Sequence, residues 1–224
     1  MYKYLLFDAD NTLLDFDLAE ETALRETLLQ CPLGFCEEVH RRYHMINDHE
    51  WKRLEMGETT RERLRIERFE KLYTEFGLDG KKYGEDTAEI YEGMLALQGQ
   101  LIDGAEDILK KFSEKYDCYI VTNGIADVQR SRMSKTPLER YIKHSFISQE
   151  LGCSKPSPVF FESVFEYIGD KDRSEYLVIV DSLSSDIAGA AAVGIDSVWI
   201  SSHGESALPT YRIEKLSELY SILD

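Results

Sequence analysis

The sequence predicts an α/β fold, in which a mainly parallel sheet carries helices on both faces and an all-helical domain is inserted into the chain. Beyond residue 101, short apolar runs alternate with stretches of helical periodicity, which is typical of successive βαβ units. From residue 16 to residue 98 the chain is instead charge-rich and helix-periodic, without a comparable apolar run. We therefore expect a Rossmann-like core formed by residues 1–15 and 99–224, with residues 16–98 as the inserted helical domain.

Each predicted element rests on its own local pattern. Strands are expected at Leu5–Phe7, Tyr119–Val121, Ser145–Ile147 and Leu177–Val180, and helices from about Ala105, after Gly124, from Pro158 and through Ala188 to Val193. In the last of these helices Gly189 and three alanines leave little side-chain bulk, so we expect it to approach the sheet closely.

The inserted domain contains a clear helix signal. Thr59 and Glu62 are spaced as a capping box, in which each side chain binds a backbone N–H of the first helical turn. An apolar stripe follows and ends at Gly77, a residue that favours helix termination. The stripe consists of Leu64, Phe69, Leu72, Tyr73 and Phe76. We expect these side chains to form the core of the domain.

The first predicted strand stops at two carboxylates and a hydroxyl, Asp8, Asp10 and Thr12. In open parallel sheets ligands bind beyond the carboxyl ends of the strands, so side chains there line a crevice. Two carboxylates so close together repel each other and need a cation, a donor or a proton. We predict that Asp8 is a nucleophile and metal ligand, and that Asp10 acts as general acid and then base. The alternative is a solvated turn, which Asp and Asn also favour.

A second apolar run ends at Thr122, Asn123 and Gly124, immediately before a helical pattern. The N-terminus of a helix offers free N–H groups and the positive end of its dipole, and two of these side chains add donors. We predict that these three residues bind phosphate oxygens. A helix cap without a ligand is the alternative interpretation.

Lys155 lies in a loop, Cys153–Pro158, that two prolines stiffen. Ser157 and Pro158 occupy the N-cap and first helical positions of the following helix. A lysine on such a loop can be aimed at Asp8 and at a phosphate, and would neutralise both. The alternative is a lysine that is merely solvated.

The apolar run Leu177–Val180 again breaks at an acid, Asp181, and a second acid, Asp186, follows five residues later. We predict that Asp181 is a second metal carboxylate. Asp186 is expected to bind a metal-bound water or to orient Lys155. An acid that only complements the helix dipole is the alternative for Asp186.

Taken together and in this order, the four segments resemble the haloacid dehalogenase (HAD) superfamily of phosphohydrolases. The matching residues are Asp8, Asp10 and Thr12 in the first motif, Thr122 in the second, Lys155 in the third, and Asp181 and Asp186 in the fourth. The resemblance spans essentially the whole chain, including Leu101–Ala105, which looks like the return from a cap domain to the core, and Val198–Ile200.

The resemblance implies a phosphoaspartate formed on Asp8. It further implies Mg²⁺ as cofactor, bound by the carboxylates of Asp8 and Asp181 and by the backbone carbonyl of Asp10. Hard oxygen ligands of this kind also suit Mg²⁺ on chemical grounds. Thr12 and Asp186 are expected to support these ligands without binding the metal themselves.

Asp10 indicates which reaction of the superfamily to expect. The dehalogenases lack this second aspartate, because a departing halide needs no proton, whereas a phosphate ester expels an alkoxide that does. The helical cap, Leu101–Ala105 and Val121–Gly124 look most like the 5′-nucleotidase branch that acts on pyrimidine nucleoside monophosphates. We therefore expect a Mg²⁺-dependent phosphomonoesterase, a nucleoside 5′-monophosphatase.

Three alternatives remain open at this point. One is a sugar-phosphate or phosphoglycolate phosphatase, the second is a non-catalytic sensor of phosphorylated ligands, and a haloacid dehalogenase is the least favoured. The sensor gains weight from Val180, because relatives with a Gly-Asp-Ser motif carry glycine before the acid. A branched side chain that pointed into the crevice would crowd the Asp8 loop.

Composition narrows the partners. The formal net charge of −16 disfavours nucleic acid and anionic membranes as partners. It also repels the expected small phosphorylated metabolite at long range, which raises the demand on Mg²⁺, Lys155 and the helix N-termini near the site. No run is long enough to span a bilayer and no leader precedes the first strand, so we expect a cytoplasmic protein. The cysteines, Cys31, Cys36, Cys118 and Cys153, fit no metal spacing, and we expect reduced thiols. His40, His44 and His49 are interpreted as part of a charged helix face rather than as a metal site.

Overall fold

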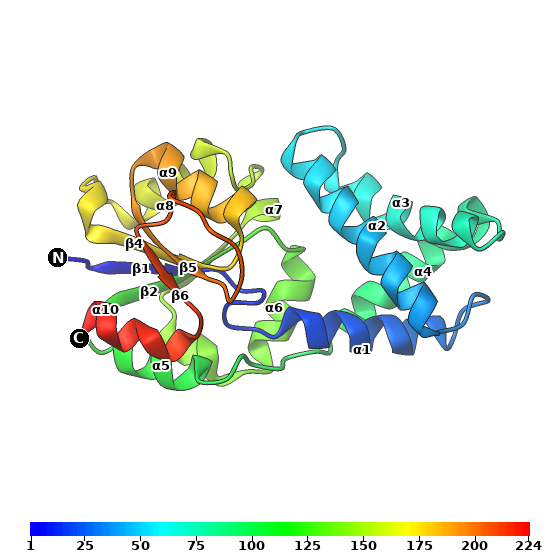
Figure 1. Cartoon of the computed structure of the whole chain (residues 1–224), viewed down its shortest axis with the longest axis horizontal. Helices are drawn as coiled ribbons and strands as arrows, with labels where there is room; N and C mark the ends of the chain where they lie inside the picture. Colours follow the sequence, from blue (N-terminus) through cyan, green and yellow to red (C-terminus); the bar gives the residue numbers. More distant parts are fainter. The chain divides into compact units, whose positions relative to one another are not determined.

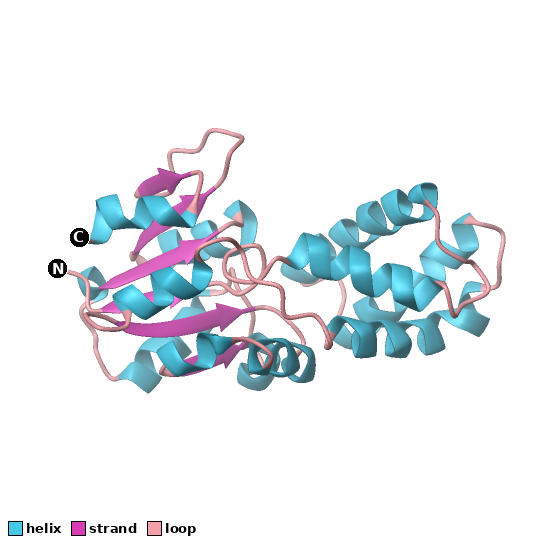
Figure 2. Ribbon diagram, turned by 90° about the horizontal axis from the view of Figure 1, so that it is seen from below, coloured by secondary structure: helices cyan, strands magenta, loops and turns pink.

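The predicted parallel sheet is confirmed. A computed structural model describes residues 1–224 and contains one six-stranded sheet, in the order β3-β2-β1-β4-β5-β6, in which every neighbouring pair is parallel (Figures 1 and 2). The strands are β1 (Tyr4–Phe7), β2 (Asp117–Thr122), β3 (His144–Ile147), β4 (Tyr176–Val180), β5 (Asp196–Ile200) and β6 (Tyr211–Ile213). The motif-bearing strands β2, β1 and β4 are thus direct neighbours in the centre of the sheet.

Helices divide into two groups along the chain. The inserted segment holds α1 (Phe16–Leu28), α2 (Glu37–Glu55), α3 (Arg61–Glu75) and α4 (Gly80–Leu95). The remainder holds α5 (Ala105–Phe112), α6 (Ala126–Ser134), α7 (Ser148–Leu151), α8 (Pro158–Ile168), α9 (Ala188–Val193) and α10 (Tyr220–Leu223), with a π-helical turn at Leu183–Ile187 before α9. No helix is both long and apolar enough to pass through a lipid bilayer.

Two compact units result, which we call the core unit (Met1–Phe16 and Gly99–Asp224) and the helical unit (Asp17–Gln98). The predicted boundary after residue 15 lies one residue before the observed one. Within the helical unit the rings of Tyr43, Phe69 and Tyr91 meet at centroid distances of 5.2 to 5.6 Å, and all three are fully buried. These aromatic contacts tie α2, α3 and α4 together.

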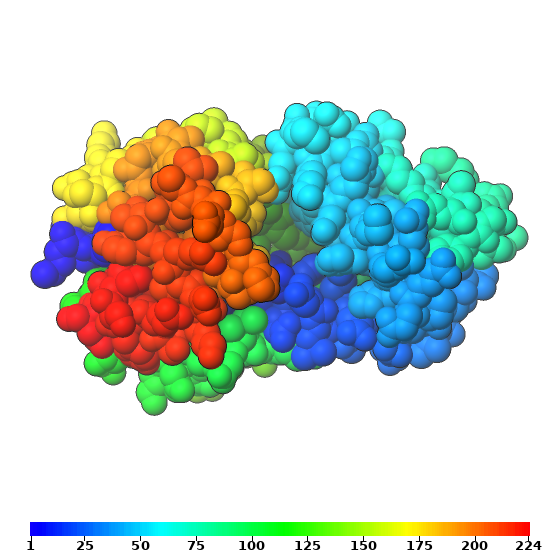
Figure 3. Space-filling model, viewed as in Figure 1, coloured from blue at the N-terminus to red at the C-terminus, as the bar shows by residue number.

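Alternation along the strands gives the sheet two apolar faces. On one face Leu5, Phe7 and Ile179 belong to a cluster with α5 and the C-terminal turn, which also holds Leu216 and Leu219. The C-terminal residues of this region, orange to red, form part of the core unit's visible surface (Figure 3). The opposite face packs against α8 and α9. The helices predicted for both faces are therefore present.

Val180 belongs to the second of these clusters and not to the crevice. Its side chain is fully buried among apolar neighbours that include Val121, Phe161 and Ile187. The concern that a branched residue here crowds the Asp8 loop is therefore wrong. Because strand side chains alternate, Val180 points to the face of the sheet that α8 and α9 cover.

The start of α3 corrects the predicted capping box by one residue. Thr60, not Thr59, is the N-cap, and its hydroxyl accepts a hydrogen bond from the Arg63 N–H at 3.4 Å. The apolar stripe behaves as expected, with Leu64 and Phe69 almost fully buried, and Gly77 follows the helix with a φ of 74°.

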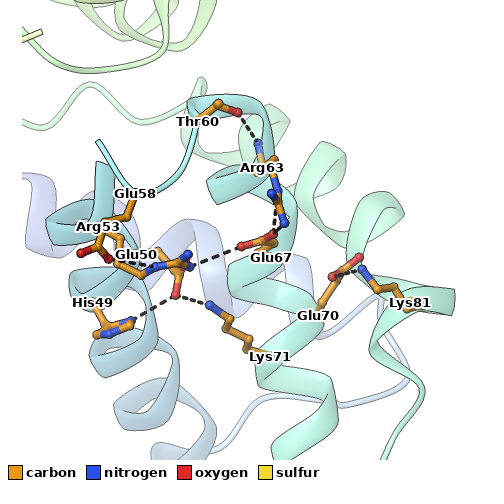
Figure 4. A network of polar contacts seen from close by, with 10 residues as sticks. All are labelled: His49, Glu50, Arg53, Glu58, Thr60, Arg63, Glu67, Glu70, Lys71 and Lys81. Atoms are coloured by element: carbon orange, nitrogen blue, oxygen red, sulfur yellow. Dashed lines mark hydrogen bonds and ion pairs between the residues drawn. The ribbon is translucent and has the colours of Figure 1, made fainter. Parts of the chain in front are cut away.

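Two of the histidines on α2, His44 and His49, form ion pairs. Glu50 is fully buried and is contacted by Lys71, Arg53 and His49 (Figure 4). His44 in turn contacts Glu20 at 3.0 Å. This is the charged face expected from the sequence. All four cysteines are free.

Gly189 departs from its expected role. A Cβ added to it would lie 2.7 Å from Cε2 of Phe161 and 3.3 Å from Cα of Pro156. The small residue therefore lets α9 approach α8 and the loop that carries Lys155, rather than the sheet itself.

Replacing Gly189 by alanine is expected to destabilise the protein by about 1–3 kcal/mol, because the added methyl group overpacks a buried contact. Gly93→Ala is the matched control, since that glycine lies in α4 with no atom near its added Cβ. The control is expected to stabilise by about 0.5–1 kcal/mol. Urea unfolding measures both, and an equal stabilisation of the two variants would contradict the packing argument.

The pair of His44 and Glu20 predicts a pH-dependent stability. The hydrogen bond to Glu20 raises the pKa of His44 to about 9, from 6.5 in the unfolded chain. Its stabilisation is therefore complete below about pH 6.5 and is lost as the pH rises through about 9. We expect His44→Asn to lower the free energy of unfolding more at about pH 6 than at about pH 10. His203→Asn, which removes an exposed loop histidine, is the matched control.

Candidate active site

Three strand ends bring the predicted site together. Phe7 of β1 pairs with Ile120 of β2 and with Ile179 of β4. Asp8 directly follows Phe7, and Thr122 and Asp181 come two residues after Ile120 and Ile179. All three therefore reach the same edge of the sheet, close to one another. Because the strands are parallel, their carboxyl ends lie side by side at this edge.

Lys155 occupies the centre of this edge. Its Nζ donates to Oδ1 of Asp8 at 2.6 Å, to the carbonyl of Val121 at 2.9 Å, and to Oδ1 of Asp186. The side chain is only 2% exposed. Burial alone would lower the pKa of Lys155, but the carboxylates of Asp186 and Asp8 outweigh it and raise the pKa above its ordinary value. The lysine is thus held as an ammonium ion beside the predicted nucleophile.

Asn123 fixes the backbone of that lysine. Its Oδ1 accepts the Lys155 N–H at 3.0 Å, and its Nδ2 donates to the Lys155 carbonyl at 2.9 Å. Both the oxygen and the nitrogen of the Asn123 side chain therefore bind protein backbone. The amide that was predicted to contact phosphate already has these two partners. The structure makes Asn123 a clamp on the lysine loop.

Thr122 and Gly124 form a tight turn at the start of α6. The Thr122 Oγ1 accepts from the Gly124 N–H at 3.1 Å and from Nε2 of Gln129 at 3.0 Å. These two bonds leave the hydroxyl proton of Thr122 to donate to a ligand. A Cβ on Gly124 would lie 2.4 Å from Cγ of Gln129, so glycine is required where the helix meets the turn.

Two residues that sequence reasoning missed hold Asp10. Gln129 Nε2 donates to Oδ2 of Asp10 at 2.9 Å, and Arg132 Nη1 donates to Oδ1 at 2.5 Å. Both lie on α6, and both are almost completely buried. The sequence held one indication that these side chains are buried. Gln129 and Arg132 are three residues apart, on the same helix face as the apolar residues Val128 and Met133.

Asp186 and Thr12 lie behind these groups. Besides Lys155, Asp186 accepts the hydroxyl of Ser185 at 2.5 Å and is nearly fully buried. Its geometry matches the predicted role of orienting the lysine. Thr12 is also buried, and its hydroxyl has no hydrogen-bond partner within the protein.

The charges at this edge fit a divalent cation. Four carboxylates, those of Asp8, Asp10, Asp181 and Asp186, face two cations, Lys155 and Arg132. Burial raises the pKa of Asp8 well above its ordinary value, against the opposing charge of Lys155. Burial and the charge of Asp186 raise the pKa of Asp181 to about 7. A cation bound between these buried carboxylates would stabilise their charged forms and lower both pKa values.

The donor set also fits the chemistry of magnesium. The carboxylates gathered at this edge are hard oxygen donors, the ligand type that Mg²⁺ prefers. No group of three or more His, Cys, Asp or Glu side chains is arranged to hold a metal. A site that takes its third protein ligand from a backbone carbonyl does not require such a group.

Comparison with known proteins decides the family. Residues 2–194 match the model of the haloacid dehalogenase-like hydrolases. The chain belongs to this family. The HAD assignment made from the four motifs is therefore confirmed, and the protein is a hydrolase.

Full-length relatives agree with the assignment. The pyrimidine 5′-nucleotidase PynA of Streptococcus pneumoniae is 37% identical, with 100% of this chain and 95% of PynA covered. The pyrimidine 5′-nucleotidase YjjG of Escherichia coli is 29% identical, with 99% of this chain and 98% of YjjG covered. The magnesium-bound crystal structure of the HAD hydrolase YfnB from Bacillus subtilis superposes with a TM-score of 0.91 at 36% identity, covering 100% of this chain and 99% of that one.

Substitution of the central lysine tests the electrostatics of this HAD site. Lys155→Met is expected to destabilise the fold by about 3–5 kcal/mol, because it leaves the buried carboxylates of Asp8 and Asp186 without their cation. Lys143→Met is the matched control. Lys143 pairs with Asp117 at 3.5 Å on the surface, and its loss should cost at most about 1 kcal/mol. Similar unfolding midpoints in urea for the two variants would show that the buried ammonium is not a structural support.

Proposed function

We propose that the protein is a Mg²⁺-dependent phosphomonoesterase that works through a phosphoaspartate on Asp8. One observation carries the proposal: Asp8 lies at the tip of β1 with the buried ammonium of Lys155 bound to it, while Asp10 is held two residues further along. A carboxylate nucleophile beside a fixed cation suits attack on an anionic phosphate.

The first step uses both aspartates. An oxygen of Asp8 forms a bond to phosphorus while the bond from phosphorus to the leaving oxygen breaks, and Asp10 gives its proton to that oxygen. Lys155, the Thr122 hydroxyl and N–H groups at the start of α6 offset the negative charge on the transferring phosphoryl group. The products of this step are an alcohol and an aspartyl phosphate.

The second step restores the enzyme. Asp10, now a carboxylate, takes a proton from water as the water oxygen attacks phosphorus, and the bond to Asp8 breaks. Inorganic phosphate leaves, and Asp10 is protonated again. The same residue therefore serves as acid and then as base.

The carboxylates of Asp8 and Asp181 and the carbonyl of Asp10 would hold Mg²⁺. When bound, the ion supplies positive charge that lowers the repulsion between an anionic nucleophile and an anionic phosphate. The excess of carboxylates at the strand ends supports this cofactor, as does the magnesium-bound structure of the YfnB relative.

The proposed substrate is a nucleoside 5′-monophosphate. Two relatives that match along the full chain are pyrimidine 5′-nucleotidases, which supports this substrate class. We propose that the helical unit is the cap that excludes water and selects the leaving group. The net charge of −16 disfavours nucleic acid as a substrate.

Phosphate release from a panel of nucleoside 5′-monophosphates, sugar phosphates and phosphoglycolate tests the proposal. We expect turnover of pyrimidine nucleotides with Mg²⁺ and none with a chelator. Asp8→Asn should lower kcat by roughly 10³-fold or more, because it removes the nucleophile. Asp117→Asn, at a half-buried aspartate at the start of β2, is the matched control and should retain full activity.

The panel also separates the alternatives. Preferential turnover of sugar phosphates would replace the nucleotide assignment while leaving the mechanism intact. Halide release from 2-haloacids without Mg²⁺ would indicate a dehalogenase. Binding of phosphorylated ligands without turnover of any of them would indicate a sensor and would overturn the proposed reaction.

A further inference from the structure

Gln129 and Arg132 form a closed ring of hydrogen bonds with Asp10. Arg132 Nη1 donates to Oδ1 of Asp10 and, at 2.9 Å, to Oε1 of Gln129. Gln129 Nε2 donates to Oδ2 of Asp10 at 2.9 Å and to Oγ1 of Thr122 at 3.0 Å. Both carboxylate oxygens of Asp10 are thus bound, and one amide group joins Asp10 to the hydroxyl of Thr122.

The surroundings of the ring hold it in place. Gln129 is 1% exposed and packs so tightly on Gly124 that even a methyl group there would clash. The Arg132 side chain is fully buried, and its guanidinium carbon lies 5.5 Å from the centre of the Phe16 ring. Side chains locked by packing in this way can orient a neighbour without a large entropic cost at the time of reaction.

We propose that Gln129 and Arg132 are positioning residues that align Asp10, the general acid and base, with the phosphoryl group bound near Thr122. Neither residue transfers a proton. Their shared contacts place the carboxylate of Asp10 and the hydroxyl of Thr122 in one rigid frame, and a proton transfer depends steeply on such alignment. This inference rests on the proposed phosphatase function.

The leaving group distinguishes this role from general structural support. An alkyl phosphate expels an alkoxide that needs a proton from Asp10, whereas 4-nitrophenyl phosphate expels a stable phenolate that does not. The leaving group departs in the first step, which kcat/KM reports, whereas hydrolysis of the aspartyl phosphate is common to both esters. Gln129→Met and Arg132→Met should therefore lower kcat/KM for the alkyl substrate by roughly 10- to 100-fold, a part of the 10²- to 10⁴-fold typical of general acid catalysis. The kcat/KM for 4-nitrophenyl phosphate should fall less than about 3-fold.

Three further variants keep the test independent of folding defects. Arg130→Met on the same helix is the matched control, because Arg130 only pairs with Glu150 at the surface. Arg132→Lys should recover part of the lost kcat/KM for the alkyl substrate, since an ammonium can still donate to Asp10. Asp10→Asn combined with Gln129→Met should be no slower than Asp10→Asn alone, because residues that act through one group are not additive. Circular dichroism and thermal unfolding of each variant report its folding.

The outcomes are separable. A wild-type protein that releases phosphate from neither ester overturns the proposed function and this inference with it. If Asp10→Asn shows the leaving-group-dependent loss and folded Gln129→Met does not, the phosphatase mechanism stands and the positioning role is overturned. Equal losses on both esters, or additive effects with Asp10→Asn, also overturn the positioning role. The selective, non-additive loss supports it.

Discussion

The buried ammonium of Lys155 is the interaction on which the candidate site depends. Moving an ion out of water costs several kcal/mol, and the attraction of Asp8 and Asp186 offsets that cost only when the geometry is well maintained. The surrounding structure provides that geometry. Asn123 binds both backbone groups of the lysine, and Gly189 allows α9 to pack directly on the following proline. The lysine is therefore held by packing as well as by charge, and it binds Asp8, the proposed nucleophile.

The parallel sheet explains why so many charges meet in one place. Each central strand is buried on both faces by apolar clusters, so its polar residues can only follow its end. The ends of β2, β1 and β4 share an edge, and each delivers a polar or acidic group to it. Burial, together with the neighbouring acids, raises the pKa of Asp8 and that of Asp181. An excess of carboxylates over cations costs stability, and it is typical of a functional site that binds a metal ion.

Sequence reasoning succeeded where a local pattern has one physical solution. Apolar runs of four or five residues before acids are typical of buried strands, and the motif residues follow them at fixed positions. It failed where a side chain's direction matters. Val180 was suspected of crowding the site, but strand alternation turns it into the core. Asn123 was predicted to bind phosphate, and the structure shows a second use that the sequence did not indicate, because its amide binds the backbone of Lys155. Gln129 and Arg132 went unnoticed, because a glutamine and an arginine on a helix are ordinarily solvent-exposed.

By itself, the sequence determined the α/β order, the segment inserted between residues 16 and 98, and the identity of the acids, hydroxyl and lysine at the strand ends, since these follow from periodicity and from short motifs. Only the tertiary structure decided which atoms meet. Residues 8, 155 and 186 are far apart along the chain, and their contact depends on the order of strands in the sheet. The ring around Asp10 likewise depends on how α6 is rotated against the sheet. Such rotation is set by the packing of many side chains at once, which no local pattern encodes.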